Sequence, residues 1–257
     1  MKIVVCVKQV PDSAAKVVVE AGEISWGDAP LVINPWDEYA VEGALRMAEA
    51  QGGDVTVLTM GKDESKEALK HALAMGCQEA ILISDPALAG ADSLVTAQVL
   101  AAAVRKLGAV DLVVFGRQAI DGDAGVTAAQ TARVLGYPAL TLSANAGRLE
   151  NGKIVIERTI EEGRQVVESN LPAVISYVKD IGEPRYPSFM GIRKASRAQI
   201  PVWSLADLEI SAPQARIKWP EVYNPPSRDI STEIITGDSP QDIAEKLADK
   251  ILAEKVL

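Results

Sequence analysis

A short apolar run that opens into a glycine-containing loop constrains the fold of this 257-residue chain more than any other feature. Residues 112–115 are apolar at every position, which is typical of a strand buried on both faces, as in a parallel sheet. The loop that follows contains Gly116, Gly122 and Gly125, and residues 126–135 are predicted to form a helix. The sequence therefore predicts a strand–loop–helix unit whose loop can turn tightly and approach a ligand closely.

The same loop is a candidate phosphate site, because a helix start offers free N–H groups and partial positive charge. It has neither the Gly-Lys-Ser/Thr of a P-loop nor the close glycine spacing of the dinucleotide fingerprint. Asp121 and Asp123 add negative charge, which N–H groups, Thr127 or Arg117 would have to offset. Two interpretations remain open from this local pattern: a nucleotide site, or an acidic turn that caps its own helix.

Apolar runs alternate with helical patterns through the first half of the chain. Strands are expected at residues 2–7, 55–59 and 80–83, helices at 37–51, 65–75 and 93–107, and a hairpin within 17–33. Asp37 is expected to cap the first helix. This alternation predicts an α/β fold with a doubly wound, mostly parallel sheet and right-handed crossovers.

After Pro138 the pattern changes. Short strand-like segments at 141–145, 153–159, 166–168 and 173–177 are expected to extend the sheet as antiparallel strands. A segment with Pro213, Pro220, Pro225 and Pro226 follows, and then an amphipathic helix over 239–252 that Ser239 caps. We therefore expect an α/β nucleotide-binding domain at 1–210 and an arm with a terminal helix at 211–257. The arm either wraps a partner subunit or packs on its own domain.

Composition excludes several functional classes. The net charge of −9 argues against a general nucleic-acid-binding protein, which would carry a basic face. Cys6 and Cys77 fit reduced thiols better than a disulfide framework, and a single histidine, His71, argues against a His-rich metal site or a Ser-His-Asp triad. The chain begins directly with a strand and has no run of about 20 apolar residues. We expect no metal, no membrane span and a cytoplasmic location.

Six segments, in order, resemble the β subunit of electron transfer flavoproteins. They are Val5-Cys-Val-Lys-Gln-Val-Pro11, Asn34-Pro-Trp-Asp-Glu-Tyr-Ala-Val-Glu42, Ala72-Leu-Ala-Met-Gly76, Gly116-Arg-Gln-Ala-Ile-Asp-Gly-Asp123, Leu171-Pro-Ala-Val174 and Glu183-Pro-Arg-Tyr186. The resemblance runs from residue 1 to about 210 and returns in the terminal helix. It implies a Rossmann-like, adenine-nucleotide α-hydrolase-like fold and an electron carrier without catalytic residues. It also implies a heterodimer whose α subunit holds most of the redox-active FAD.

The resemblance further implies a nucleotide site in this subunit, usually filled by AMP. The site residues it implies are Cys6, Asn34, Pro35, Trp36, Asp37, Met60, Gly116, Arg117, Gln118, Ala119, Ile120, Asp121, Gly122, Asp123, Ala124, Gly125, Val126 and Thr127. Cys6, Met60 and Gly116 fall at the carboxyl ends of three predicted strands, so they can converge on one crevice. Asn34 is expected to hydrogen-bond an adenine edge or sugar, and Thr127 a phosphate.

Some alternatives remain within this resemblance. Trp36 holds the family position beside the flavin of the α subunit, or it packs beneath its own helix. Gly90-Ala-Asp-Ser-Leu-Val-Thr96 resembles the loop of relatives that hold a second FAD in place of AMP and oxidise NADH there, whereas Glu161-Glu-Gly163 resembles the AMP type, which we prefer. A stand-alone ATP-binding or ATP-hydrolysing protein is the other class, with only Asp121 and Asp123 to supply a base or metal ligands.

Residues 183–197 match the family's recognition loop, in which an exposed leucine-like residue docks into acyl-CoA-type dehydrogenases. Phe189 takes that place here, and the expected partner-binding residues are Arg185, Tyr186, Phe189, Met190, Arg193, Lys194 and Arg197. An aromatic anchor ringed by cations has the anatomy of a binding hot spot. The alternative is a short helix over 189–195 that buries Phe189 in its own domain. A quinone reductase or another acceptor is expected to receive the electrons.

Overall fold

The computed structural model describes residues 1–219, 221–226 and 231–255, so Pro220 of the predicted arm lies outside the described residues. The chain divides into two units, Met1–Val222 and Tyr223–Leu257. The first unit extends past residue 210 because the backbone N–H groups of Arg216 and Ile217 donate to the Asp92 carboxylate at 2.6 and 3.1 Å.

The first unit is built on one large sheet with the strand order β10-β11-β9-β13-β8-β1-β6-β7-β14, and β12 pairs with β11. Seven neighbouring strands run parallel: β9 (Ala139–Ser143), β13 (Ala173–Tyr177), β8 (Leu112–Gly116), β1 (Lys2–Cys6), β6 (Asp54–Met60), β7 (Glu79–Ile83) and β14 (Val202–Trp203). β11 (Lys153–Ile160) runs antiparallel to β9, and β10 (Arg148–Glu150) and β12 (Gly163–Asn170) each pair antiparallel with β11. The mostly parallel α/β sheet is as predicted from the sequence.

One part of that prediction was wrong, since two of the later segments are not antiparallel. β13 lies directly beside β8 and parallel to it, and β9 is parallel to β13. The cause is α4, which carries the chain from the end of β8 over the sheet and so returns β9 in the same direction. The chain reverses direction at the tight turns between β10 and β11 and between β11 and β12.

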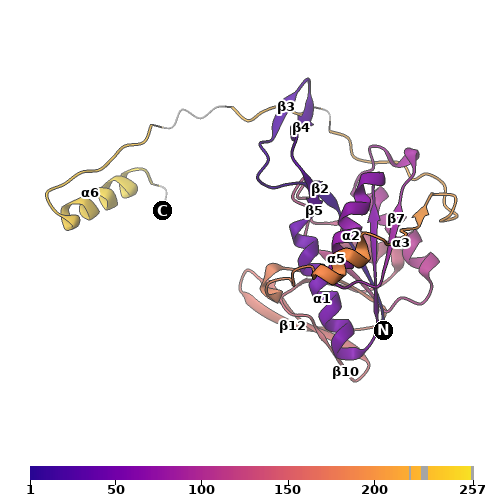
Figure 1. Cartoon of the computed structure of the whole chain (residues 1–257). Coiled ribbons are helices and arrows are strands. Elements are labelled where there is room, and N and C mark those ends of the chain that lie inside the picture. Colours follow the sequence, from indigo (N-terminus) through magenta and orange to yellow (C-terminus); the bar gives the residue numbers. More distant parts are fainter. Residues whose placement is uncertain (220, 227–230, 256–257) are drawn as a thin grey trace. The chain divides into compact units, whose positions relative to one another are not determined.

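Helices cover both faces of the sheet. α1 (Pro35–Gln51) and α2 (Lys66–Met75) share one apolar core with Ile3 and Val5 of β1. α3 (Ser93–Leu107) and α4 (Thr127–Leu135) share the other core with Val4 and Cys6. Successive side chains of a strand point to opposite faces of the sheet. Because β1 is buried on both faces, its alternate residues belong to two separate cores. Figure 1 shows α2 and α3 on opposite sides of the strands.

Smaller elements complete the first unit. β2 (Gln9–Pro11) pairs with β5 (Leu31–Ile33), and β3 (Val18–Glu20) with β4 (Glu23–Ser25), which is the hairpin expected within 17–33. α5 (Phe189–Ala195) packs on α2. Single 3₁₀ turns lie at Asp63–Ser65, Pro86–Leu88 and Lys179–Ile181.

The predicted start of the first long helix was wrong by two residues. α1 begins at Pro35, and Asn34 is its N-cap residue. Proline suits a first helical position, because the N–H that it lacks has no partner within a helix there. Asp37 lies inside the first turn, and its carboxylate accepts the Lys8 backbone N–H at 2.7 Å. Asp37 therefore links α1 to the end of β1 rather than capping the helix.

The second unit contains α6 (Pro240–Ala253), close to the predicted range. Ser239 caps it as predicted, with its hydroxyl oxygen accepting the Asp242 N–H at 3.1 Å. None of the α6 residues is buried, and Leu247 and Leu252 are 47% and 64% exposed. Across the described parts of both units, no helix has the length and apolar character that crossing a membrane demands.

Candidate functional site

A cleft of about 230 Å³ opens at the carboxyl ends of β1, β6 and β8, and Cys6, Met60 and Gly116 line it. The chain leaves β1 towards β6 and β7, then crosses back through α3 to β8 on the other side of β1. Such a reversal in strand order leaves a crevice between the diverging connections, where open α/β sheets bind ligands. The three strand ends therefore meet where the sequence led us to expect.

The loop between β8 and α4 forms much of the cleft wall. Its lining residues are Gly116, Arg117, Gln118, Ala119, Asp121, Gly122, Asp123, Ala124, Gly125 and Thr127. A Cβ at Gly116 would lie 2.4 Å from Asp37 Oδ1 and 2.6 Å from the Trp36 carbonyl oxygen, so only glycine fits there. Gly125 has φ +63°, which a β-branched residue adopts only under strain. Glycine thus packs the loop against α1 at one end and turns it into α4 at the other.

The two helices that begin at the cleft differ in how their first N–H groups are satisfied. Asp92 caps α3, with Oδ1 accepting the Val95 N–H at 2.8 Å, and this side chain lines the cleft. α4 has Val126 as its N-cap residue and no side-chain cap, and Thr127 and Ala128 of its first turn line the cleft. The start of α4 can therefore receive an anion, whereas a carboxylate already holds the start of α3.

Asn34 shapes the loop. Its side chain is fully buried, with Nδ2 donating to the Gln118 carbonyl at 2.8 Å and Oδ1 accepting the Ile120 N–H at 3.2 Å. These bonds differ from the expected contact with a base or sugar, because the loop itself uses both ends of the amide. Neither Asn34 nor Ile120 is among the cleft-lining residues, and the same holds for Pro35, Trp36 and Val126.

One of the two loop carboxylates forms an ion pair, and the other accepts a hydrogen bond from a neutral amide. Lys8 Nζ lies 2.6 Å from Asp121 Oδ2, and Gln118 Nε2 donates to Asp123 Oδ1 at 2.8 Å. The Arg117 guanidinium lies 5.5 Å from the centre of the partly exposed Trp36 ring, a cation–π distance. The same ring lies 6.2 Å from that of Tyr39 in α1, so Trp36 contacts both its own helix and the loop.

Burial governs the two titratable groups at the base of the cleft. It raises the pKa of Asp37 to about 7, against the opposing effect of hydrogen bonds from the Lys8 N–H, Asn34 and the Gly116 N–H. Burial, together with the nearby Asp37 charge, also raises the pKa of the Cys6 thiol far above its ordinary value. A buried thiol held in its protonated form is a wall residue and a poor nucleophile.

The start of α3 contributes lining residues that the sequence-based site did not include: Ala91, Asp92, Ser93, Thr96 and Leu100. Val7, Lys8, Phe115 and Ala128 also belong to the wall. The residues at the start of α3 follow the carboxyl end of β7, a fourth parallel strand. Because ligands bind at the carboxyl ends of parallel strands, this position in the sequence could have assigned them to the cleft.

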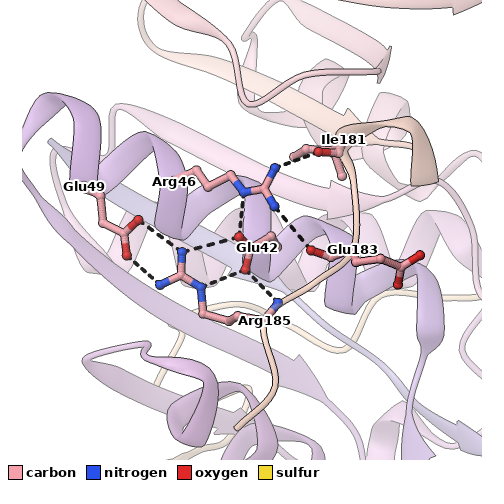
Figure 2. Close-up of polar contacts among 6 residues, drawn as sticks. All are labelled: Glu42, Arg46, Glu49, Ile181, Glu183 and Arg185. Atoms are coloured by element: carbon pink, nitrogen blue, oxygen red, sulfur yellow. Dashed lines mark hydrogen bonds and ion pairs between the residues drawn. The ribbon is translucent and has the colours of Figure 1, made fainter. Parts of the chain in front are cut away.

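The recognition loop presents an exposed apolar surface. Tyr186, Phe189 and Met190 are 93%, 81% and 69% exposed, and Arg193, Lys194 and Arg197 are exposed beside them. A helix does form at Phe189–Ala195, but Ala195 is its buried residue and Phe189 is not. Arg185 differs from the rest, because its guanidinium is bound to Glu42 and Glu49 of α1 (Figure 2).

Among the described residues, no three His, Cys, Asp or Glu side chains are grouped so that they could hold a metal ion. The cleft combines the start of α4 without a side-chain cap, two loop carboxylates with polar partners, and apolar wall residues such as Met60, Leu100 and Phe115. These features suit the binding of an organic phosphate.

Comparison with known proteins agrees with this architecture. The family model described as "Electron transfer flavoprotein domain" matches residues 27–208. The chain is 35% identical to "Electron transfer flavoprotein subunit beta" of Megasphaera elsdenii and 36% identical to "Caffeyl-CoA reductase-Etf complex subunit CarD" of Acetobacterium woodii, each over the full length of both proteins. It is 39% identical to "Protein FixA" of Azorhizobium caulinodans, over 80% of this chain and 76% of that protein. The chain belongs to the electron transfer flavoprotein family as a β subunit, which makes it part of an electron carrier and not an enzyme.

Proposed function

We propose that this chain pairs with an α subunit that holds most of the redox-active FAD, and that its own cleft holds AMP. The heterodimer takes electrons from an acyl-CoA-type dehydrogenase and passes them to a quinone reductase or another acceptor. The observation that carries the AMP site is the uncapped start of α4, which faces a cleft lined by a glycine-containing loop. The two reduced, buried cysteines fit the cytoplasm as the compartment.

The residues of the cleft fit an adenine nucleotide. The first N–H groups of α4 and the Thr127 side chain would hold the phosphate. Lys8 offsets one negative charge of the loop by its ion pair with Asp121, and Arg117, which also lines the cleft, supplies a second positive charge in the same loop. Met60, Leu100 and Phe115 supply apolar wall for the base. In this role the chain's residues bind and orient the nucleotide.

A second candidate is a second FAD at the same cleft, where NADH would be oxidised. The observation that favours it is the position of Ala91, Asp92, Ser93 and Thr96, which line the cleft next to α4. This segment gives the cleft a further wall beyond the phosphate-binding loop, where the remainder of a dinucleotide would extend. Both candidates place an adenosine phosphate at α4.

Identification of the released nucleotides tests these proposals. The heterodimer, produced together with its α subunit, is denatured, and the nucleotides are separated by chromatography and identified by mass. One AMP and one FAD per heterodimer supports the first candidate, and two FAD without AMP supports the second. A heterodimer that releases one FAD and no other nucleotide overturns both. ATP turnover by the purified protein would instead support the stand-alone hydrolase class.

We also propose that Phe189 is the apolar anchor for the dehydrogenase, with Tyr186 and Met190 beside it and Arg193, Lys194 and Arg197 as a polar rim. Their exposure in this chain supports the proposal, because large apolar side chains grouped on a surface mark interaction sites. CarD carries the name of a complex with caffeyl-CoA reductase, which is consistent with a partner that acts on an acyl-CoA.

A further inference from the structure

We infer that Glu42, Arg46, Glu49 and Arg185 form a clamp that sets the orientation of the recognition loop, so that Arg185 positions the docking surface and does not itself bind the partner. This inference rests on the proposed docking function of the recognition loop. Figure 2 shows the clamp, with three side chains from α1 converging on the segment that contains Ile181, Glu183 and Arg185.

Arg185 commits four of the five N–H donors of its guanidinium to Glu42 and Glu49. Its Nε donates to Glu42 Oε2 at 2.8 Å, and Nη2 lies 3.4 Å from Glu42 Oε1. Nη1 and Nη2 donate to the two oxygens of Glu49 at 2.5 and 3.1 Å, and the backbone N–H of Arg185 also donates to Glu42, at 3.1 Å. A partner that drew this guanidinium away from Glu42 and Glu49 would have to break charge-assisted bonds to two carboxylates.

Arg46 closes the clamp from the other side. Its Nε donates to Glu42 Oε1 at 2.6 Å, while Nη1 and Nη2 donate to the carbonyls of Ile181 and Glu183 at 2.7 and 3.2 Å. The positive charges of Arg46 and Arg185 therefore balance the negative charges of Glu42 and Glu49. The side chain of Glu42 is only 4% exposed. Burial alone would raise its pKa, but hydrogen bonds from Arg185 and Arg46 outweigh burial and hold that pKa below its ordinary value.

The clamp is close enough to α5 to control it. Only Tyr186, Pro187 and Ser188 separate Arg185 from the start of α5, and Ser188 caps α5 by accepting the Gly191 N–H at 2.9 Å. In its first turn, α5 lies so close to α2 that a Cβ on Gly191 would be 2.2 Å from the Ala74 carbonyl oxygen. The recognition loop is thus attached at two places, and Phe189 lies exposed between them.

Hydrogen exchange of the heterodimer tests the clamp without any partner. In Arg185→Met we expect the amides of residues 186 and 188–195 to exchange at least about tenfold faster, because the anchor to α1 is gone. Arg185→Lys keeps the positive charge but loses the planar guanidinium that binds two carboxylates. Its exchange rates should lie between those of the wild type and Arg185→Met. Arg148→Met, which removes an exposed arginine paired with Glu150 in β10, is the matched control and should leave these amides unchanged. Unchanged exchange in Arg185→Met overturns the clamp.

Electron-transfer kinetics separate positioning from direct contact. The acyl-CoA dehydrogenase that reduces the heterodimer is assayed at increasing heterodimer concentrations. Arg185→Met should raise the half-saturating concentration about fivefold or more, with the limiting rate and flavin content unchanged. In a Phe189→Ala background the same substitution should change it by less than about twofold, because the clamp acts through the position of Phe189.

The remaining outcomes are distinct. An equal effect of Arg185→Met in both backgrounds means that Arg185 contacts the dehydrogenase directly, and it overturns the inference. Phe189→Ala that leaves the half-saturating concentration unchanged overturns the proposed docking function instead. In that case the exchange measurement still decides whether the clamp holds the recognition loop.

Discussion

At the scale of single residues, Asp37 makes a sharp prediction about pH. Its pKa rises from an ordinary 3.8 to about 7 because the carboxyl is buried, so between these values the folded chain holds a proton that the unfolded chain has lost. The contribution of Asp37 to stability therefore declines as pH rises through this range and stays low above pH 7. Asparagine does not titrate, so the free energy of unfolding of Asp37→Asn should fall less over this pH range than that of the wild type. The difference should be at most about 4 kcal/mol.

Urea unfolding at several pH values between 5 and 8 measures the effect. Asp63→Asn is the control, since Asp63 is an exposed carboxylate paired with Lys66, and its pH profile should run parallel to that of the wild type. If Asp37→Asn also ran parallel, the buried carboxyl would not be linked to folding.

Phe189 provides a second prediction at this scale. Burying one such side chain in a partner contributes roughly 1.5–3 kcal/mol. Phe189→Ala should therefore weaken docking about tenfold or more, with flavin content and thermal stability unchanged, because the ring is 81% exposed in this chain. Ile24→Ala, at a half-exposed position in the β3–β4 hairpin, is the control in the same reduction assay. A destabilised Phe189→Ala protein would instead place the ring in a core.

At the scale of elements, the loop and α4 act as one binding unit. Gly125 turns the chain into α4 at φ +63° and lines the cleft. Gly125→Val should both strain this turn and fill the approach to the first N–H groups of α4, so we expect a heterodimer whose cleft retains less than about a tenth of the wild-type nucleotide.

Gly136→Val is the matched control. Gly136 ends the same helix at φ +76° and lies outside the cleft, so it carries the same backbone strain without the obstruction. The nucleotide content of both variants is measured after denaturation. Equal losses in the two proteins would mean that α4 stability, not access to its start, controls binding.

At the scale of the whole molecule, the two units differ in how they are stabilised. The first unit has an apolar core on each face of its sheet, whereas α6 of the second unit buries none of its residues. We predict that deleting residues 225–257 weakens association with the α subunit at least about tenfold and reduces flavin retention, while the thermal stability of the first unit is kept. Sedimentation and flavin content measure this. A truncated chain that still forms a stable, flavin-loaded complex would contradict a wrapping role.

The sequence predicted much of the first unit because its signals are local. Residues 93–107 were expected to be a helix and are α3, and residues 126–135 differ from α4 by one position. The apolar run 112–115 is buried on both faces in β8, as its composition indicates. The direction of β13 was not predictable in this way, since a short apolar strand has the same pattern in parallel and antiparallel pairing.

By itself, the sequence indicated the long helices of the first unit and the buried strands between them, because these elements follow from spacings of two to four residues. It also determined that three strand ends meet at a cleft, since parallel strands share one carboxyl edge. Only the tertiary structure decided that Asn34 binds the loop at Gln118, and that Arg185 belongs to Glu42 and Glu49. Those partners are 84, 143 and 136 residues apart, and which groups meet over such separations depends on how the packed elements are placed.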